Sequence, residues 1–199
     1  PEGKDWKEYV DSRRLEITCG EAPYIVSRYD AATGDMIDIK DRIGILDRKL
    51  RVVNENTRDH EEWFKWTLRA FQSVYGYEWQ GDSLLIARMN LLMTFMEYYK
   101  ARWKYDPTDE KSLPMVLQIA NVIAWNFWQM DGLTGTVPYG EAVEKPEKQK
   151  QLTFFDMGWM GEEQPTESTE ENMLVERQEC KIFDWRSKES LFYSSLQKG

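Results

Sequence analysis

The sequence predicts an α/β protein with a mostly parallel sheet. Three short stretches with strand character, LEIT (15–18), YGYEW (75–79) and WNFWQM (125–130), alternate with longer stretches of helical periodicity. Strands that alternate with helices pair in parallel, and we expect the sheet to be covered on both faces. The length of 199 residues fits one domain, or one domain with an appended tail.

Two helices are predicted between the first and second strands. Residues 41–56 carry an apolar stripe at helical spacing. Residues 59–76 begin with Asp59, a good N-cap, and we expect Gly76 to end this second helix before the strand. The stripe of the first helix consists of Ile43, Leu46, Leu50 and Val53.

Two further helices are predicted before the third strand. Residues 81–103 are apolar nearly all round, which predicts a largely buried helix with Asp82 or Ser83 as its N-cap. A shorter apolar helix is predicted at about 113–125. The ordered part of the chain therefore extends over 1–140.

The composition changes after this domain. Residues 141–178 are rich in Glu, Lys, Gln, Thr and Pro and are predicted to be an acidic, flexible linker. Order is expected to return over 179–199, with a strand at about 180–186 and a polar end.

Composition and charge narrow the function classes. The formal net charge is −9 without a cluster of Lys and Arg, so tight DNA binding by this chain alone is not expected. Two Cys and one His exclude a Cys/His zinc site, so no metal is expected, and they do not favour a disulfide framework, which points to the cytoplasm. No apolar run is long enough to cross a bilayer and no signal-peptide pattern begins the chain, so no membrane partner is expected.

Candidate ligand-binding residues follow the three predicted strands. The CGEAP turn contains Gly20, which lets a ligand approach the backbone. Glu78 ends the second strand, where a carboxylate can accept hydrogen bonds from ribose hydroxyls. Asp131 follows the third strand and can accept from an exocyclic amine. Because ligands of parallel sheets bind at the carboxyl ends of strands, these features predict a pocket for an adenosine-containing ligand.

The same segments resemble three motifs of the adenine-N6 DNA methyltransferases of restriction-modification systems. LEITCGEAPYIV (15–26) is similar to motif I, VYGYEWQGDSLLIARMNLLMTF (74–95) to motif II, and NFWQMDGL (126–133) to motif III. The matching residues are Leu15, Glu16, Cys19, Gly20, Gly76, Glu78, Ala87, Arg88, Asn90, Leu91, Asp131 and Leu133.

The resemblance implies a Rossmann-like S-adenosyl-L-methionine methyltransferase fold and that cofactor. Gly20 would lie under the cofactor, with Glu16 or nearby backbone at its amino-acid end. Tyr24 and Trp79 would flank the adenine ring. The implied cofactor-binding residues are Glu16, Cys19, Gly20, Ala22, Tyr24, Glu78, Trp79, Asp131 and Leu133.

Three features depart from the family pattern, the first being Ile17 in the place of a proline. Ala22 takes the place of the second motif-I glycine and lacks glycine's freedom at positive φ. Glu78 follows Gly20 by 58 positions, whereas a compact dinucleotide-binding fold places the acidic residue about 20 positions on. We therefore expect an insertion near 30–60.

The family's catalytic motif, (N/D)-P-P-(Y/F), does not occur in the sequence. No catalytic residue is therefore assigned, and the fold is expected to be partial, without its C-terminal catalytic half. That half, and most of the contact with DNA, would lie on a partner chain or a missing segment. It would dock on exposed apolar surface. The alternative is a non-catalytic interaction or specificity subunit that keeps the fold.

A short peptide in the predicted linker resembles another motif. QLTFF (151–155) is similar to the Q-L-x-L-F peptide by which bacterial DNA enzymes bind the replication sliding clamp. The alternative is that this peptide packs on its own domain. The residues concerned are Gln151, Leu152, Phe154 and Phe155.

Overall fold

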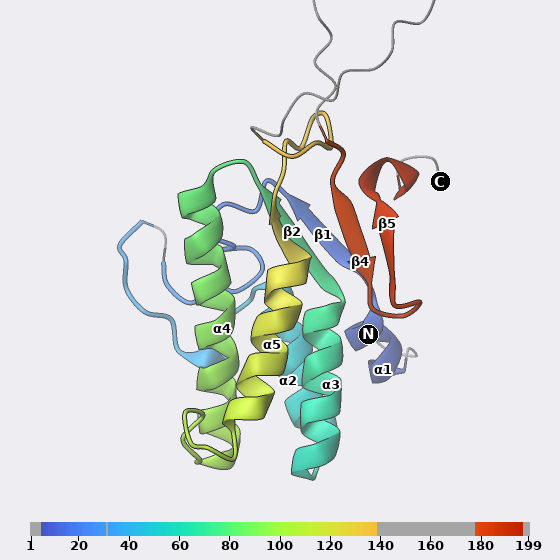
Figure 1. The fold of residues 1–199 in the computed structure, drawn as a ribbon. Coiled ribbons are helices and arrows are strands. Elements are labelled where there is room, and N and C mark those ends of the chain that lie inside the picture. Colours follow the sequence, from blue (N-terminus) through green and yellow to red (C-terminus); the bar gives the residue numbers. More distant parts are fainter. Residues whose placement is uncertain (1–4, 31, 139–177, 197–199) are drawn as a thin grey trace, which may run out of the picture.

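The computed structural model describes residues 5–30, 32–138 and 178–196 (Figure 1). It is a mixed α/β fold with five α-helices and two small sheets in these residues. The elements are α1 (Trp6–Asp11), β1 (Arg14–Ile17), η1 (Ile39–Asp41), α2 (Ile45–Asn56), α3 (His60–Gln72), β2 (Val74–Glu78), α4 (Gly81–Trp103), α5 (Leu113–Asn126), β3 (Phe127–Gln129), β4 (Lys181–Asp184), β5 (Glu189–Phe192) and η2 (Tyr193–Leu196).

The first three strands form the predicted parallel sheet. The order is β1-β2-β3, with Ile17 opposite Tyr77 and Glu78 opposite Gln129. The parallel arrangement is confirmed, and β1 is an edge strand of this sheet. All three strands therefore end on the same side of the fold, where the candidate residues follow.

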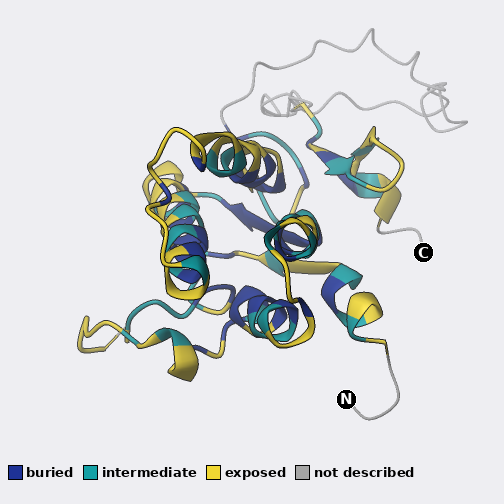
Figure 2. Cartoon of the chain, turned by 90° about the horizontal axis from the view of Figure 1, so that it is seen from below, coloured by how far each residue is buried: buried dark blue, intermediate teal, exposed yellow. Residues whose placement is uncertain are grey.

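The two faces of the sheet are covered differently. Val74 of β2 belongs to a large core shared with the helices, in which Leu46, Trp63 and Leu91 are each fully buried. Tyr77, on the other face, packs in a smaller core with residues of the C-terminal segment. Both faces are covered as expected, and the second is covered by the antiparallel β4–β5 hairpin and η2. Figure 2 shows the hairpin beside the helical body.

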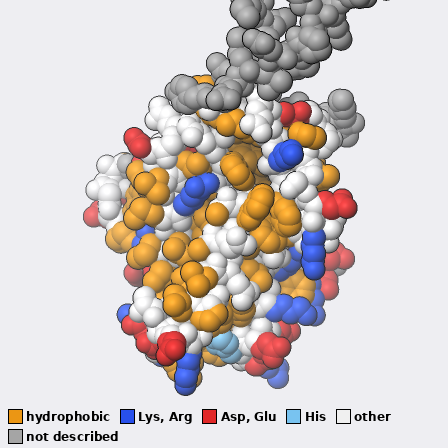
Figure 3. All heavy atoms as spheres, viewed as in Figure 1, with side chains coloured by type: hydrophobic (Ala, Val, Ile, Leu, Met, Phe, Trp, Pro, Cys, Tyr) orange, Lys and Arg blue, Asp and Glu red, His pale blue; other side chains and the backbone are white. Residues whose placement is uncertain are grey.

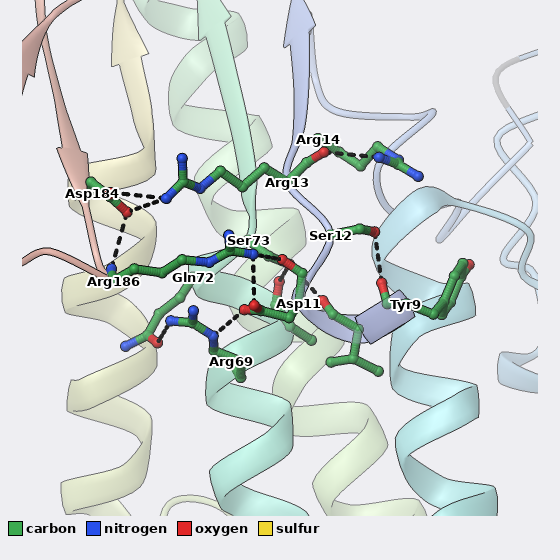
Figure 4. A network of polar contacts seen from close by, with 12 residues as sticks. Tyr9, Asp11, Ser12, Arg13, Arg14, Arg69, Gln72, Ser73, Asp184 and Arg186 are labelled. Carbon is green, nitrogen blue, oxygen red and sulfur yellow. Dashed lines mark hydrogen bonds and ion pairs between the residues drawn. The ribbon is translucent and has the colours of Figure 1, made fainter. Parts of the chain in front are cut away.

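Ion pairs fasten the hairpin to the beginning of the chain (Figure 4). Arg13 Nη2 lies 2.8 Å from Asp184 Oδ1, and Arg186 Nη2 lies 2.6 Å from Asp11 Oδ2. Asp11 also accepts from Arg69 of α3. The N-terminal segment, α3 and the hairpin are therefore joined by one polar network. The hairpin itself was not expected, because the sequence predicts a strand and then a polar end.

The helix before β2 ends earlier than predicted. Asp59 caps α3 as expected, its side chain accepting from Glu62 N, but the helix stops at Gln72. Gly76 lies inside β2 and does not end the helix. The reason is packing: a Cβ on Gly76 would lie 2.6 Å from Phe127 Cε1, so only glycine admits the Phe127 ring here.

The helix α4 is less buried than predicted. Its N-cap is Gln80, not Asp82 or Ser83. One side is buried through residues such as Leu91, whereas Met89 is 58 % exposed on the other. Apolar composition all round the helix was interpreted as full burial, but the opposite side faces solvent.

The predicted insertion contains a loop with η1 and the helix α2. Leu50 and Val53 of the predicted stripe are buried, whereas Ile43 is exposed and precedes the helix. The predicted linker, apart from its last residue Gln178, lies outside the described residues. Of the helices that the structure describes, none is long and apolar enough to cross a membrane.

Lys49 of α2 makes the stability depend on pH. It is 1 % exposed, and Nζ donates to Val10 O and Ser12 O and to Ser73 Oγ. Burial, followed by the charge of Arg14, lowers the pKa of Lys49 from 10.5 to about 7. Between these two pH values the unfolded lysine holds a proton that the folded lysine has released. The free energy of unfolding therefore rises with pH over this window.

We expect the difference in unfolding free energy between wild type and Lys49→Met to change by about 2 kcal/mol between pH 7 and 9, in favour of wild type. Urea unfolding at each pH measures it. Lys40→Met, at an exposed lysine, is the control and should show the same pH dependence as wild type. A pH-independent difference for Lys49→Met would contradict the assignment.

Candidate functional site

The structure brings the ends of the three parallel strands together. The backbone N–H of Gly20 donates to Glu78 Oε2 at 2.8 Å, which joins the turn after β1 to the end of β2. Met130 N donates to Glu78 O at 2.9 Å, which joins the end of β3 to the same residue. Glu78 is thus the centre of the candidate site, as the sequence places it.

The carboxylate of Glu78 binds backbone rather than standing open. It is 7 % exposed, and Oε1 accepts from Trp79 N at 3.0 Å and Gln80 N at 3.1 Å. Together with Gly20, three backbone N–H groups share the two oxygens. An oxygen of a carboxylate has about two acceptor positions. One position on Oε2 therefore remains, so Glu78 has room for one ligand hydroxyl and not the two expected.

The turn after β1 uses two residues at positive φ. Gly20 has φ +53°, and a Cβ built there would meet nothing within 4 Å, so the backbone is open on this side. Ala22 also adopts a positive φ, +64°, although an alanine in the place of the motif-I glycine was not expected to do so. The turn is fixed by bonds from Ala22 N to Cys19 O and from Ile25 N to Ala22 O. These bonds offset the roughly 1–2 kcal/mol that an L-residue loses in this region.

Cys19 is buried beside the turn, whereas Glu16 is half-buried on β1. Glu16 Oε2 is buried and accepts no hydrogen bond from the described residues, and burial raises the pKa of this carboxyl group. Cys19 is 2 % exposed, and burial, with the charges of Glu78 and Glu16, raises its pKa to about 12. Cys19 is therefore a neutral thiol that supports the turn from inside.

Asp131 organises the loop after β3. Its Oδ1 accepts from Leu133 N at 2.9 Å and Thr134 N at 3.3 Å. Gly132 lies against β1, since a Cβ there would be 2.6 Å from Ile17 Cγ2. The Leu133 side chain is 96 % exposed, so its packing gives it no place in a pocket wall.

The two aromatic candidates differ in exposure. Tyr24 is 75 % exposed, close after the Gly20 turn in the chain. Trp79 is half-buried, directly after Glu78, and its carbonyl accepts from Gln129 Nε2 at 2.8 Å. Tyr24 is the aromatic residue available to a ligand without rearrangement.

Side chains of α4 and β3 hold the strand ends in place. Asn90 Nδ2 donates to Glu21 O at 3.0 Å and so fixes the Gly20 turn from the helix. Arg88 Nε donates to Phe127 O at 3.0 Å, at the start of β3. These are the motif-II residues whose roles composition does not reveal. The sequence did not point to Gln129 as a site residue. Its position at the end of β3, shortly before Asp131, is the signal that could have identified it.

Two cavities in the described residues lie away from this edge of the sheet. One, of about 470 Å³, lies between α1 and α3, and the other, of about 490 Å³, lies beside α2. In the described ranges no group of three or more His, Cys, Asp or Glu side chains could hold a metal ion. The sliding-clamp peptide, 151–155, lies outside these ranges.

Comparisons with known proteins find no match. No protein-family model, no curated protein and no solved structure matches this chain.

Proposed function

We propose that this chain is the S-adenosyl-L-methionine-binding part of a DNA adenine-N6 methyltransferase of a restriction-modification system. The observation that carries the proposal is the Gly20–Glu78 hydrogen bond of 2.8 Å between the ends of adjacent parallel strands. It puts the glycine turn and the acidic residue of the resembled motifs at one point. The sheet order β1-β2-β3 also agrees with half of a Rossmann-like doubly wound sheet, in which strands 3-2-1 are neighbours.

The residues present fit the cofactor in part. The open backbone at Gly20 admits a close approach. The remaining acceptor position of Glu78 suits one ribose hydroxyl, and the exposed ring of Tyr24 suits a base or a cation. When bound, the cofactor supplies a methyl group on a sulfonium. The protein's own contribution is orientation: the turn, Glu78 and Asp131 would fix the donor against a base presented elsewhere.

Catalysis would need a second component. The sequence holds no (N/D)-P-P-(Y/F) motif, so a partner chain or further segment would bind the flipped adenine and most of the DNA. The net charge of −9 agrees with this division of labour. Sliding-clamp binding through 151–155 remains a separate proposal.

One observation favours a second candidate function, a non-catalytic interaction or specificity subunit. Three of the acceptor positions of Glu78 are taken by the chain's own backbone. A carboxylate used in this way can stabilise the strand ends without any ligand. The two candidates differ in whether the chain binds the methyl donor.

Calorimetric titration with S-adenosyl-L-methionine tests the proposal. We expect wild type to bind and Tyr24→Ala to bind about tenfold more weakly, since an aromatic contact is worth roughly 1–1.5 kcal/mol. Tyr24 is 75 % exposed, so its removal should leave stability unchanged. Tyr105→Ala, at a tyrosine 61 % exposed after α4, is the matched control and should bind as wild type does. Absence of binding by wild type would favour the second candidate.

A further inference from the structure

An apolar surface covers the exposed side of α4, α5 and β3. Figure 3 shows hydrophobic side chains gathered over these helices, with acidic residues at the margins. We call it the α4/α5 face. Its residues are 38 to 60 % exposed: Leu85, Ile86, Met89, Met93, Leu113, Leu117, Trp125 and Trp128.

The α4/α5 face is nearly free of charge. The helix α5 and strand β3 contain no Asp, Glu, Lys or Arg, and α4 contains only Arg88 between positions 84 and 96. The Arg88 guanidinium donates through Nε and Nη2 to Phe127 O, so these two nitrogens are engaged with the chain's own backbone. Met and Trp, which are enriched in protein interfaces, make up half of the face.

The face is large enough for a stable interface. An aromatic side chain has roughly 150–250 Å² of surface; if the aliphatic side chains are taken at about 200 Å² too, the exposed fractions amount to about 700 Å² on each copy. A standard interface buries about 800 Å² on each partner. A patch of this size exceeds what single soluble domains usually expose.

We infer that the α4/α5 face is the self-association surface of the chain, through which two copies form a symmetric dimer. Two chains of charge −9 repel one another, and the repulsion is weakest where they meet through a surface without acidic groups. The α4/α5 face meets this condition. In a twofold dimer the α4/α5 face of one chain packs against the α4/α5 face of the other. The flexible methionine side chains can adjust their conformations so that the two faces fit.

The dimer and the proposed cofactor site can be tested separately, because the α4/α5 face extends well beyond the site. Leu117 lies on the half of α5 remote from β3, whereas the site lies beyond the carboxyl ends of the strands. The catalytic half is expected to dock on exposed apolar surface, but that half has to reach the carboxyl ends of the strands, and we assign the α4/α5 face to a second copy instead. Dimerisation is measured without any ligand, and its failure leaves the titration result untouched.

Sedimentation velocity between about 1 and 100 μM, a range that covers micromolar dissociation constants, tests the inference. We expect wild type to sediment at twice its mass of 23.7 kDa. Met89→Glu and Leu117→Glu should each be monomers over this range. Because the dimer is symmetric, either substitution places two negative charges in the interface, one from each chain. Their circular dichroism should equal that of wild type, since both residues are 58 to 60 % exposed.

Met36→Glu is the matched control, at a methionine 61 % exposed on the loop before α2, and it should remain a dimer. Two results would overturn the inference. One is a monomeric wild type at every concentration, which would leave the face to a different protein. The other is a dimer that persists in both Met89→Glu and Leu117→Glu.

Discussion

Replacing Glu78 by alanine is expected to lower the free energy of unfolding by about 3 kcal/mol. The change removes the acceptor of three backbone N–H groups, and a hydrogen bond to a charged group contributes roughly 1.5–3 kcal/mol. The full sum is not reached, because water can hydrate part of the released backbone at this edge. Urea unfolding of wild type and variant measures the loss.

Two further variants test whether the loss comes from the hydrogen bonds of the Glu78 carboxylate. One keeps the shape of the side chain, and the other is a control at an exposed glutamate. Glu78→Gln keeps the shape but replaces one acceptor oxygen by an N–H₂ donor, so its loss should lie between wild type and Glu78→Ala. Glu55→Ala, at an exposed position of α2, should change stability by less than about 0.5 kcal/mol. Equal stability of Glu78→Ala and wild type would show that these bonds do not hold the strand ends together.

Gly76→Ala is expected to cost about 2–3 kcal/mol, because the centre of β2 has no room for a methyl group. The added Cβ would lie 2.6 and 2.8 Å from two carbons of the Phe127 ring and 3.0 Å from Cys19 Sγ. Both neighbours are buried, so neither can move aside freely. Thermal and urea unfolding would show the loss.

The source of this loss can be tested within the chain. A smaller side chain in Phe127→Leu should make the two changes non-additive, with the double variant less destabilised than the sum of the single variants. Gly81→Ala is the control: its Cβ would be no closer than 3.7 Å to another atom, and stability should stay level or rise. Strict additivity of Gly76→Ala and Phe127→Leu would refute steric conflict as the cause.

Periodicity predicted the parallel sheet and its helices because an element that is buried on one side carries apolar residues at a regular spacing in the sequence. It did not reveal the role of Gly76, since glycine within a strand resembles glycine after a helix until the Phe127 ring is placed beside it. The α4/α5 face was hidden for a related reason. Apolar residues on the solvent side of α4 have the composition of a core, and only the neighbouring elements distinguish the two.

The candidate site was predicted to the level of its elements. The meeting of Gly20 and Glu78 follows from their places after adjacent parallel strands. The binding of Glu78 to three N–H groups could not be foreseen, because it depends on where the amides of Trp79 and Gln80 point. Ala22 at positive φ was likewise fixed by tertiary hydrogen bonds and not by its own preference.

The attachment of the hairpin to the chain's beginning has a consequence for folding. Arg13 and Asp184 are 171 positions apart, and Arg186 and Asp11 are 175 apart. Contacts across such separations form slowly, because a long loop must close before they stabilise anything. During synthesis the Tyr75 and Tyr77 face of the sheet stays uncovered until the ribosome has made the last strands. The nascent chain therefore carries an exposed aromatic surface, which a chaperone could bind until β4 and β5 arrive.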